Sequence, residues 1–129
     1  MIYYVDTSVA LAQILAEDRV PSAGLWAETL ISSRLLEYEV WTRLNARGIG
    51  KSHGESARAL IGRIALVELA PPILARALEP FPVAVRALDA LHLASLEFLR
   101  SRGQVLQLAS YDDRQLAVAR ALGVPTVAL

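Results

Sequence analysis

Short runs of large apolar, β-prone residues alternate with helix-like stretches along this chain, and this alternation restricts the fold more than any other feature. The strand-like runs lie at residues 2–5, 105–109 and 125–128. Such alternation predicts the α/β class, with a mainly parallel central sheet flanked by helices. With 129 residues and 54% hydrophobic content, the chain can form one continuous core without disulfides. We therefore expect a single domain over residues 1–129.

The helix-like stretches are expected at residues 8–16, 22–29, 34–47, 52–66, 83–102 and 113–122. Three of them are followed by a glycine that favours a helix end: Gly48, Gly103 and Gly123. Pro21 favours the first turn of the second helix, and Ser52 with Glu55 has the spacing of a capping box. Short strands are expected at residues 30–31 and 67–69, the latter ended by Pro71 and Pro72.

Composition excludes several kinds of protein. The chain has no cysteine, which excludes disulfides, thiolate zinc sites and a cysteine nucleophile, and its two histidines are too few for a histidine-rich metal cluster. Thirteen basic residues balance thirteen acidic ones, which argues against coating of bulk nucleic acid but leaves RNA binding through a local patch open. No leader or membrane-spanning pattern is present, so we expect a cytoplasmic protein without membrane contact.

Two aspartates follow strand-like runs. Asp6 comes directly after the first run, and Asp112 lies three residues after the run at 105–109. The carboxyl ends of parallel strands share one edge of the sheet, which is where open α/β sheets bind ligands. The alternative for Asp6 is that it only caps the following helix.

Two more acids interrupt apolar helices. Asp89 lies within LDALHLASLEFL, where an unpaired carboxylate is costly. Glu37 and Glu39 interrupt LLEYEVWTRL from nearly opposite sides of their helix, so only one can face a shared site. Glu39 could instead form a surface pair with Arg43. We expect His92, three residues after Asp89, to be a packed and hydrogen-bonded core histidine.

Four carboxylates at one sheet edge repel each other unless a cation neutralises them or some hold protons. Oxygen-only ligands select Mg²⁺ or Mn²⁺ rather than zinc. Such a site recruits phosphate groups and serves phosphodiester hydrolysis, in which the cation activates water and offsets the charge on the phosphoryl oxygens.

Four motifs, in this order, resemble PIN-domain ribonucleases, and most closely the VapC toxins of toxin–antitoxin pairs: VDTSVALA, LLEYEVWTRLNARG, ALDALHLASL and SYDDRQLAVARALGVP. Together they span nearly the whole chain. The resemblance implies a PIN-like fold and a Mg²⁺-dependent endoribonuclease, with Mn²⁺ as a possible substitute. It further implies a homodimer that is held inactive by a VapB-type antitoxin laid across the helices near the acidic cleft.

The resemblance also implies roles for individual residues. It places catalysis and metal binding on Asp6, Glu39, Asp89 and Asp112, and so selects Glu39 over Glu37. Ser8 and Ser110 become hydroxyl neighbours of the cluster, although the family usually has threonine at position 110. Asp113 directly follows Asp112 and is a second candidate ligand, but alignment with the motif favours Asp112.

Surplus apolar surface points to partner chains. The mean hydropathy is +0.39, and Trp26, Tyr38 and Trp41 lie on or near the early helices. One small core does not easily bury so much apolar area. We therefore expect Trp41 or its neighbours in a dimer or antitoxin interface, the alternative being that both tryptophans pack internally.

The sequence bears on three other functions. A catalytically silent PIN-like module that binds RNA or protein is the main alternative, although all four acids are present. An aspartate phosphatase wants a second aspartate two residues after the first, where this chain has Ser8. The RGIGKS segment imitates part of a P-loop, but Asn45 stands where its first glycine belongs and a helix precedes it.

Overall fold

A four-stranded parallel sheet forms the centre of the protein, which the computed structural model describes over residues 1–129. Its strands are β1 (Ile2–Val5), β2 (Thr29–Ser33), β3 (Ala65–Val67) and β4 (Leu106–Ala109), in the spatial order β3-β2-β1-β4. All three strand pairs are parallel, and Tyr3 of β1 is in register with Leu30 of β2 and Gln107 of β4. The predicted α/β class with a parallel sheet is confirmed.

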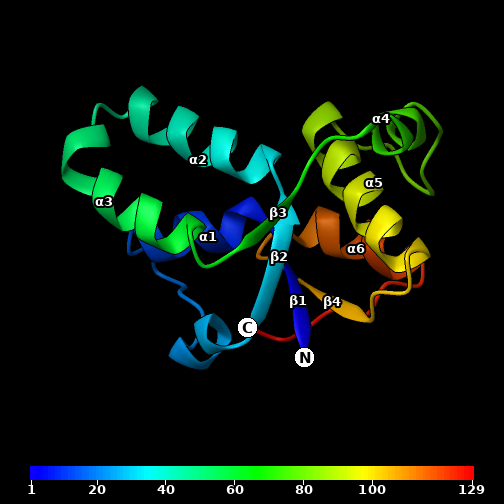
Figure 1. The fold of residues 1–129 in the computed structure, drawn as a ribbon, viewed down its shortest axis with the longest axis horizontal. Helices are drawn as coiled ribbons and strands as arrows, with labels where there is room; N and C mark the ends of the chain where they lie inside the picture. The colour runs from blue at the N-terminus through cyan, green and yellow to red at the C-terminus, as the bar shows by residue number, and fades with distance from the viewer.

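Helices cover both faces of the sheet (Figure 1). Helices α1 (Thr7–Ile14), α2 (Leu35–Ala46) and α3 (Gly50–Ile61) contact one another, and α4 (Pro71–Ala77) packs on α5 (Ala87–Ser101), with α6 (Asp113–Ala121) near the latter pair. Successive strand residues point to opposite faces, so Val5 belongs to one buried apolar cluster and Tyr4 to the other. Apolar packing on both faces of the sheet therefore fixes the carboxyl end of β1 in place.

Two of the expected helices are wrong in part. Residues 22–29 form only a short 3₁₀ helix, η1 (Ala23–Ala27). The helix expected at residues 52–66 begins at Gly50 and ends at Ile61, so Ser52 lies inside α3 and is no cap. Its hydroxyl donates to the carbonyl of Ile49 at 3.2 Å instead. The predicted capping box is therefore wrong.

The segment after α3 also differs from expectation. The short strand lies at Ala65–Val67 rather than at residues 67–69, and Pro71 and Pro72 begin α4, which the sequence did not suggest. Proline suits the first turn of a helix because the amide hydrogen that it lacks has no partner there. Residues 125–128 form a single parallel bridge, Leu108 to Thr126, instead of a strand.

Three helices end just before the glycines that the sequence marked as helix ends. Gly48, Gly103 and Gly123 have φ angles of +67°, +87° and +78°, a conformation that other residues rarely adopt. The remaining helices begin and end within a few residues of their predicted bounds, the largest shift being that α5 begins at Ala87 instead of residue 83. None of the helices has both the length and the apolar composition that a membrane crossing requires.

Candidate functional site

The four predicted acids line one pocket at the carboxyl edge of the sheet. This acidic pocket has a volume of about 440 Å³ and includes Asp6, Glu39, Asp89 and Asp112 in its wall. Asp6 directly follows β1 and Asp112 follows β4, whereas Glu39 comes from α2 and Asp89 from the first turn of α5. Four elements far apart in the sequence thus each supply one carboxylate.

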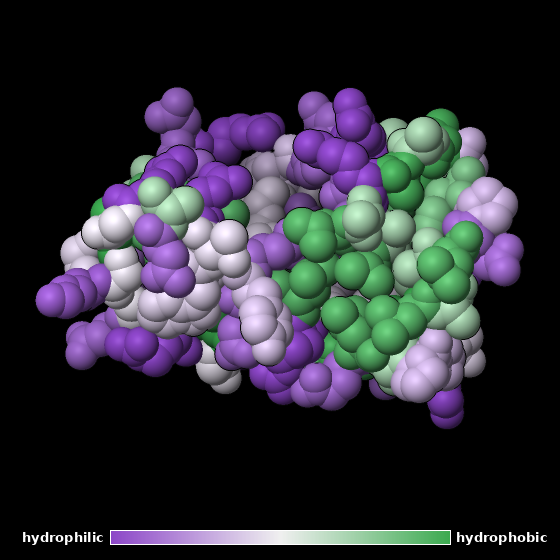
Figure 2. Space-filling model, turned by 90° about the horizontal axis from the view of Figure 1, so that it is seen from above, coloured by the Kyte–Doolittle hydropathy of each residue, from purple (hydrophilic) through white to green (hydrophobic).

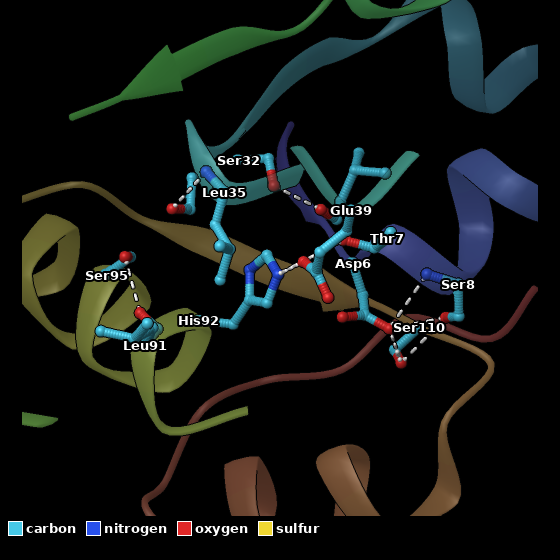
Figure 3. A network of polar contacts seen from close by, with 12 residues as sticks. Asp6, Thr7, Ser8, Ser32, Leu35, Glu39, Leu91, His92, Ser95 and Ser110 are labelled. Atoms are coloured by element: carbon cyan, nitrogen blue, oxygen red, sulfur yellow. Dashed lines mark hydrogen bonds and ion pairs between the residues drawn. The ribbon is translucent and has the colours of Figure 1, made fainter. Parts of the chain in front are cut away.

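Asp6 is held by two hydroxyl groups. The side chain is 7% exposed, and its Oδ2 accepts hydrogen bonds from Ser8 Oγ at 2.6 Å and Ser110 Oγ at 2.9 Å (Figure 3). The same oxygen caps α1 by accepting from the amide of Ser8 at 3.4 Å. The capping alternative is therefore correct as well as the placement at the sheet edge. The other carboxylate oxygen, Oδ1, receives no protein donor.

Glu39 is held by a buried polar network. Thr7 Oγ1 donates to Glu39 Oε1 at 2.7 Å, and His92 Nε2 donates to the same oxygen at 2.5 Å (Figure 3). The hydroxyl of Tyr4 hydrogen-bonds to His92 Nδ1 at 2.8 Å. His92 is 2% exposed, so the expectation of a packed, hydrogen-bonded histidine is confirmed. The network leaves Glu39 Oε2 without a protein donor.

The neighbouring acids and cations of α2 are arranged differently from Glu39. Glu37 lies 3.5 Å from Arg34 and lines another pocket, away from the four acids. Arg43 forms no ion pair with Glu39, which removes the surface-pair alternative, but it lines the acidic pocket. Arg86 also lines this pocket and lies 3.8 Å from Asp89.

Asp112 also serves as the N-cap of a helix. Its Oδ1 accepts from the amides of Arg114 at 3.0 Å and Gln115 at 3.2 Å at the start of α6. Asp113 is exposed in the first turn of α6 and does not line the pocket. Asp112, rather than Asp113, therefore faces the other acids. Its own amide donates to Ser110 Oγ at 2.9 Å, which links it to Asp6.

The electrostatics of the pocket reflect crowded negative charge. Burial raises the pKa of Asp89, as do the charges of Asp112 and Asp6, while Arg86 opposes them. Burial lowers the pKa of His92, but the hydrogen bond to Glu39 and the charges of Asp6, Glu39 and Asp89 outweigh it, so its pKa is raised overall. Both raised pKa values mean that the pocket favours the protonated forms of Asp89 and His92, which reduce its negative charge.

The donor set fits a hard divalent cation, although no three acidic or histidine side chains stand close enough to hold a metal without adjustment. Asp6, Glu39 and Asp112 each turn one carboxylate oxygen toward hydrogen-bond donors of the protein, whereas Asp89 has only the 3.8 Å contact with Arg86. Asp6 Oδ1, Glu39 Oε2 and Asp112 Oδ2 have no protein donor, and the pocket offers no sulfur ligand. Oxygen-only sites of this kind suit Mg²⁺ or Mn²⁺.

Several residues of the site were missed by sequence reasoning. Thr7 hydrogen-bonds to Glu39 directly, and Tyr4 of β1 does so through His92. Arg43 and Arg86 line the pocket beside the acids. The one available signal was position, because Thr7 directly follows Asp6. Packing across the sheet, which brings Tyr4 to His92, has no local signature in the sequence.

Comparison with known proteins identifies similar sequences over nearly the whole chain. The family model for the PIN domain matches residues 3–124. The chain is also 27% identical over 130 residues to Ribonuclease VapC47 of Mycobacterium tuberculosis (strain CDC 1551 / Oshkosh). That similarity covers 95% of this chain and 93% of the relative. The residues matched by the family model include all four acids of the pocket.

Proposed function

The chain belongs to the PIN-domain family, and from this premise we propose that it is a metal-dependent endoribonuclease and the toxin of a toxin–antitoxin pair. The observation that carries the proposal is the convergence of Asp6, Glu39, Asp89 and Asp112 on one pocket from four separate elements. The relative named a VapC ribonuclease supports the toxin assignment. We take residues 1–129 to be one domain of this kind.

The four carboxylates would hold one or more Mg²⁺ ions, or Mn²⁺ in their place. When bound, such a cation lowers the pKa of water and offsets the charge that builds on the phosphoryl oxygens. The chain itself orients the ligands: Ser8 and Ser110 fix Asp6, while Thr7 and His92 fix Glu39. Ligands that are held in place before the reaction lose little conformational freedom during it.

Charge at the pocket also limits what enters it. Four carboxylates repel RNA phosphates in the absence of a cation, so substrate binding and metal binding are coupled. Arg43 and Arg86 line the pocket beside the acids. Guanidinium groups bind phosphate oxygens in a bidentate manner, so these two arginines are suited to guide an RNA backbone across the site.

The direct test is cleavage of total cellular RNA by the purified protein, with Mg²⁺ and with EDTA. We expect discrete cleavage with Mg²⁺ or Mn²⁺ and none with EDTA. Asp113→Asn is the matched control, because this exposed neighbour of Asp112 lies outside the pocket and should leave cleavage unchanged. Cleavage that persists in EDTA, or that depends on zinc, would contradict the oxygen-ligand mechanism. Binding of RNA without any cleavage would support the silent module.

We also propose partner chains. A VapB-type antitoxin is expected to bind near the acidic pocket, where a cation from its chain would compete for the carboxylates. Trp26 is 8% exposed and donates to Gln13 at 3.2 Å, so this tryptophan packs internally. Trp41 is half-buried, and the Arg58 guanidinium carbon lies 5.4 Å from the centre of its ring in a cation–π contact. Trp41 remains a predicted interface residue.

A homodimer interface is proposed on the α4 side of the molecule. Figure 2 looks down on the carboxyl edge of the sheet and shows hydrophobic surface gathered over α4 and α5. Leu74, Leu78 and Val83 are 44%, 88% and 51% exposed there. Light scattering should give a dimer for the wild type at micromolar concentration and a monomer for Leu78→Asp. Val105→Asp, at another exposed apolar residue, should remain dimeric. A monomeric wild type would contradict the dimer.

A further inference from the structure

A second pocket opens directly beside the acidic pocket. Its volume is about 360 Å³, and we refer to it as the side pocket. Thr7, Leu11, Glu39, Arg43 and Leu88 line both pockets, so the two are continuous. The residues that line only the side pocket come from α2: Leu35, Tyr38, Thr42 and Ala46.

The walls of the side pocket are apolar, with one exposed aromatic ring. Leu11, Leu35 and Leu88 supply apolar surface, and Tyr38 is 66% exposed. Tyr38 makes no side-chain hydrogen bond and is not packed against either buried apolar cluster. An aromatic ring that the core does not use is available to stack on a ligand. Its neighbour Thr42 adds a hydroxyl group that can hydrogen-bond to a base edge.

An arginine side chain, that of Arg43, lies at the border between the two pockets. Arg43 lines both of them, is exposed, and makes no ion pair or side-chain hydrogen bond. A free guanidinium between a cation-binding pocket and an apolar pocket suits a phosphate whose attached nucleoside extends to the apolar side. Along the surface, the four acids are therefore followed by the Arg43 guanidinium and then by the apolar wall with Tyr38.

We infer that the side pocket is a nucleobase subsite, in which an unpaired base of single-stranded RNA next to the scissile phosphate stacks on Tyr38. This inference rests on the proposed ribonuclease function. Bases of single-stranded RNA are bound by stacking on aromatic side chains and by hydrogen bonds to their exposed edges. Because the pocket is continuous with the acids, its occupant must lie beside the reacting phosphate, which an RNA base does by its covalent attachment.

The test uses a pool of random 20-nucleotide single-stranded RNAs, with the cleaved ends sequenced. The wild type should prefer particular bases at one position next to the cut. Tyr38→Ala should lose this preference and raise KM roughly 10-fold, as the loss of one stacking contact does. Tyr38→Phe keeps the aromatic face and should retain the base preference and the KM of the wild type. Val105→Ala, at a 79% exposed residue outside both pockets, is the matched control.

Two further measurements make the result decisive. The affinity for Mn²⁺, measured by calorimetry, should be the same in Tyr38→Ala as in the wild type, because Tyr38 lines only the side pocket. Unchanged base preference and KM in Tyr38→Ala would overturn the subsite. Loss of antitoxin binding by this variant would not rescue it.

Failure of the ribonuclease proposal is recognised separately. If the wild type cleaves none of the pool, fluorescence anisotropy of the same labelled RNA with Mn²⁺ decides the subsite by binding alone. Weaker binding by Tyr38→Ala than by the wild type and Tyr38→Phe would support it. Equal binding by all three proteins would overturn it.

Discussion

At the scale of single residues, the two carboxylate oxygens of Asp6, and likewise those of Glu39, differ in their hydrogen bonding. One oxygen of Asp6 and one of Glu39 accept hydrogen bonds from the protein, while the other oxygen is left without a donor. The first oxygen fixes the orientation of the side chain, and the second remains available to a cation. Mutually repelling charges are thus held in place by neutral hydroxyls and one imidazole.

Asp89 tests whether this crowding costs stability. Burial and the charges of Asp112 and Asp6 raise its pKa, so the ionised form is disfavoured in the folded protein. Asp89→Asn should therefore raise the thermal midpoint in EDTA at pH 7. The same change should reduce RNA cleavage by more than the roughly 100-fold that loss of an outer partner of a metal ligand costs. A lower midpoint together with retained cleavage would remove Asp89 from the cluster.

Glu39 and Glu37 form a matched pair on one helix. Glu39→Gln should abolish cleavage, because Glu39 lies in the acidic pocket, whereas Glu37→Gln should be nearly silent, because Glu37 pairs with Arg34 elsewhere. Cleavage rates of the two variants on one RNA are the measurement. An inactive Glu37→Gln beside an active Glu39→Gln would reverse the assignment.

His92 predicts a pH dependence of stability in the metal-free protein. Its pKa is raised above the usual 6.5, so the protonated form stabilises the fold. This contribution is complete below pH 6.5 and is lost as the pH rises through the raised value. In EDTA, the thermal midpoint of the wild type should fall across this window, and that of His92→Gln should fall less. His53→Gln, which changes the other histidine, should follow the wild type; identical profiles for all three would refute the account.

At the scale of elements, two of the proposed metal ligands are also helix caps. Asp6 caps α1 and Asp112 caps α6, so the same strand-to-helix turns build the fold and present the charge. Asparagine caps a helix about as well as aspartate, whereas alanine does not. The two roles can therefore be separated by substitution.

The separation is tested at Asp112. Asp112→Asn and Asp112→Ala both remove the charge and should both abolish cleavage. Asp112→Ala also removes the cap, so its free energy of unfolding should be lower than that of Asp112→Asn by about 1 kcal/mol. Denaturant unfolding in EDTA measures this difference. Equal stabilities would mean that the hydrogen bonds to Arg114 and Gln115 contribute nothing to α6.

The elements were predicted best where local chemistry decides them. The glycines after α2, α5 and α6 mark helix ends because only glycine readily adopts a positive φ. The elements missed were those set by context: α4 begins at two prolines that also read as a strand end, and residues 125–128 pair through a single bridge. Ser52 and Glu55 match a capping box, yet α3 begins at Gly50 and encloses both.

At the scale of the whole molecule, the sheet order brings the acids together. β1 lies between β2 and β4, so the ends of β1 and β4 are adjacent, and α2 and α5 approach this edge from opposite faces. Sequence reasoning could place Asp6, Glu39, Asp89 and Asp112 on such elements, and the structure places them in one pocket. It could not supply Arg43, Arg86 or the Tyr4–His92 contact, which arise only from packing between distant elements.

Metal binding should stabilise the whole fold. An ion that binds only the folded protein adds about 2.7 kcal/mol to the free energy of unfolding at 100 times its Kd. Mg²⁺ or Mn²⁺ should therefore raise the thermal midpoint of the wild type, measured by calorimetry. Asp6→Asn should show a much smaller rise, and Asp113→Asn the full one. No rise in the wild type would argue against a cation site in the acidic pocket.

If the acidic pocket is the ribonuclease centre that we propose, cleavage depends on a bound cation and on Asp6. The most direct test is the rate of cleavage of one RNA as a function of Mg²⁺ concentration, for the wild type and for Asp6→Asn. Asp6 retains a hydrogen-bonding oxygen as asparagine, so the fold and the cap of α1 should persist. We expect the cleavage rate to rise and saturate with Mg²⁺ in the wild type and to stay at the EDTA level in Asp6→Asn. Equal, Mg²⁺-dependent cleavage by both proteins would contradict this proposal.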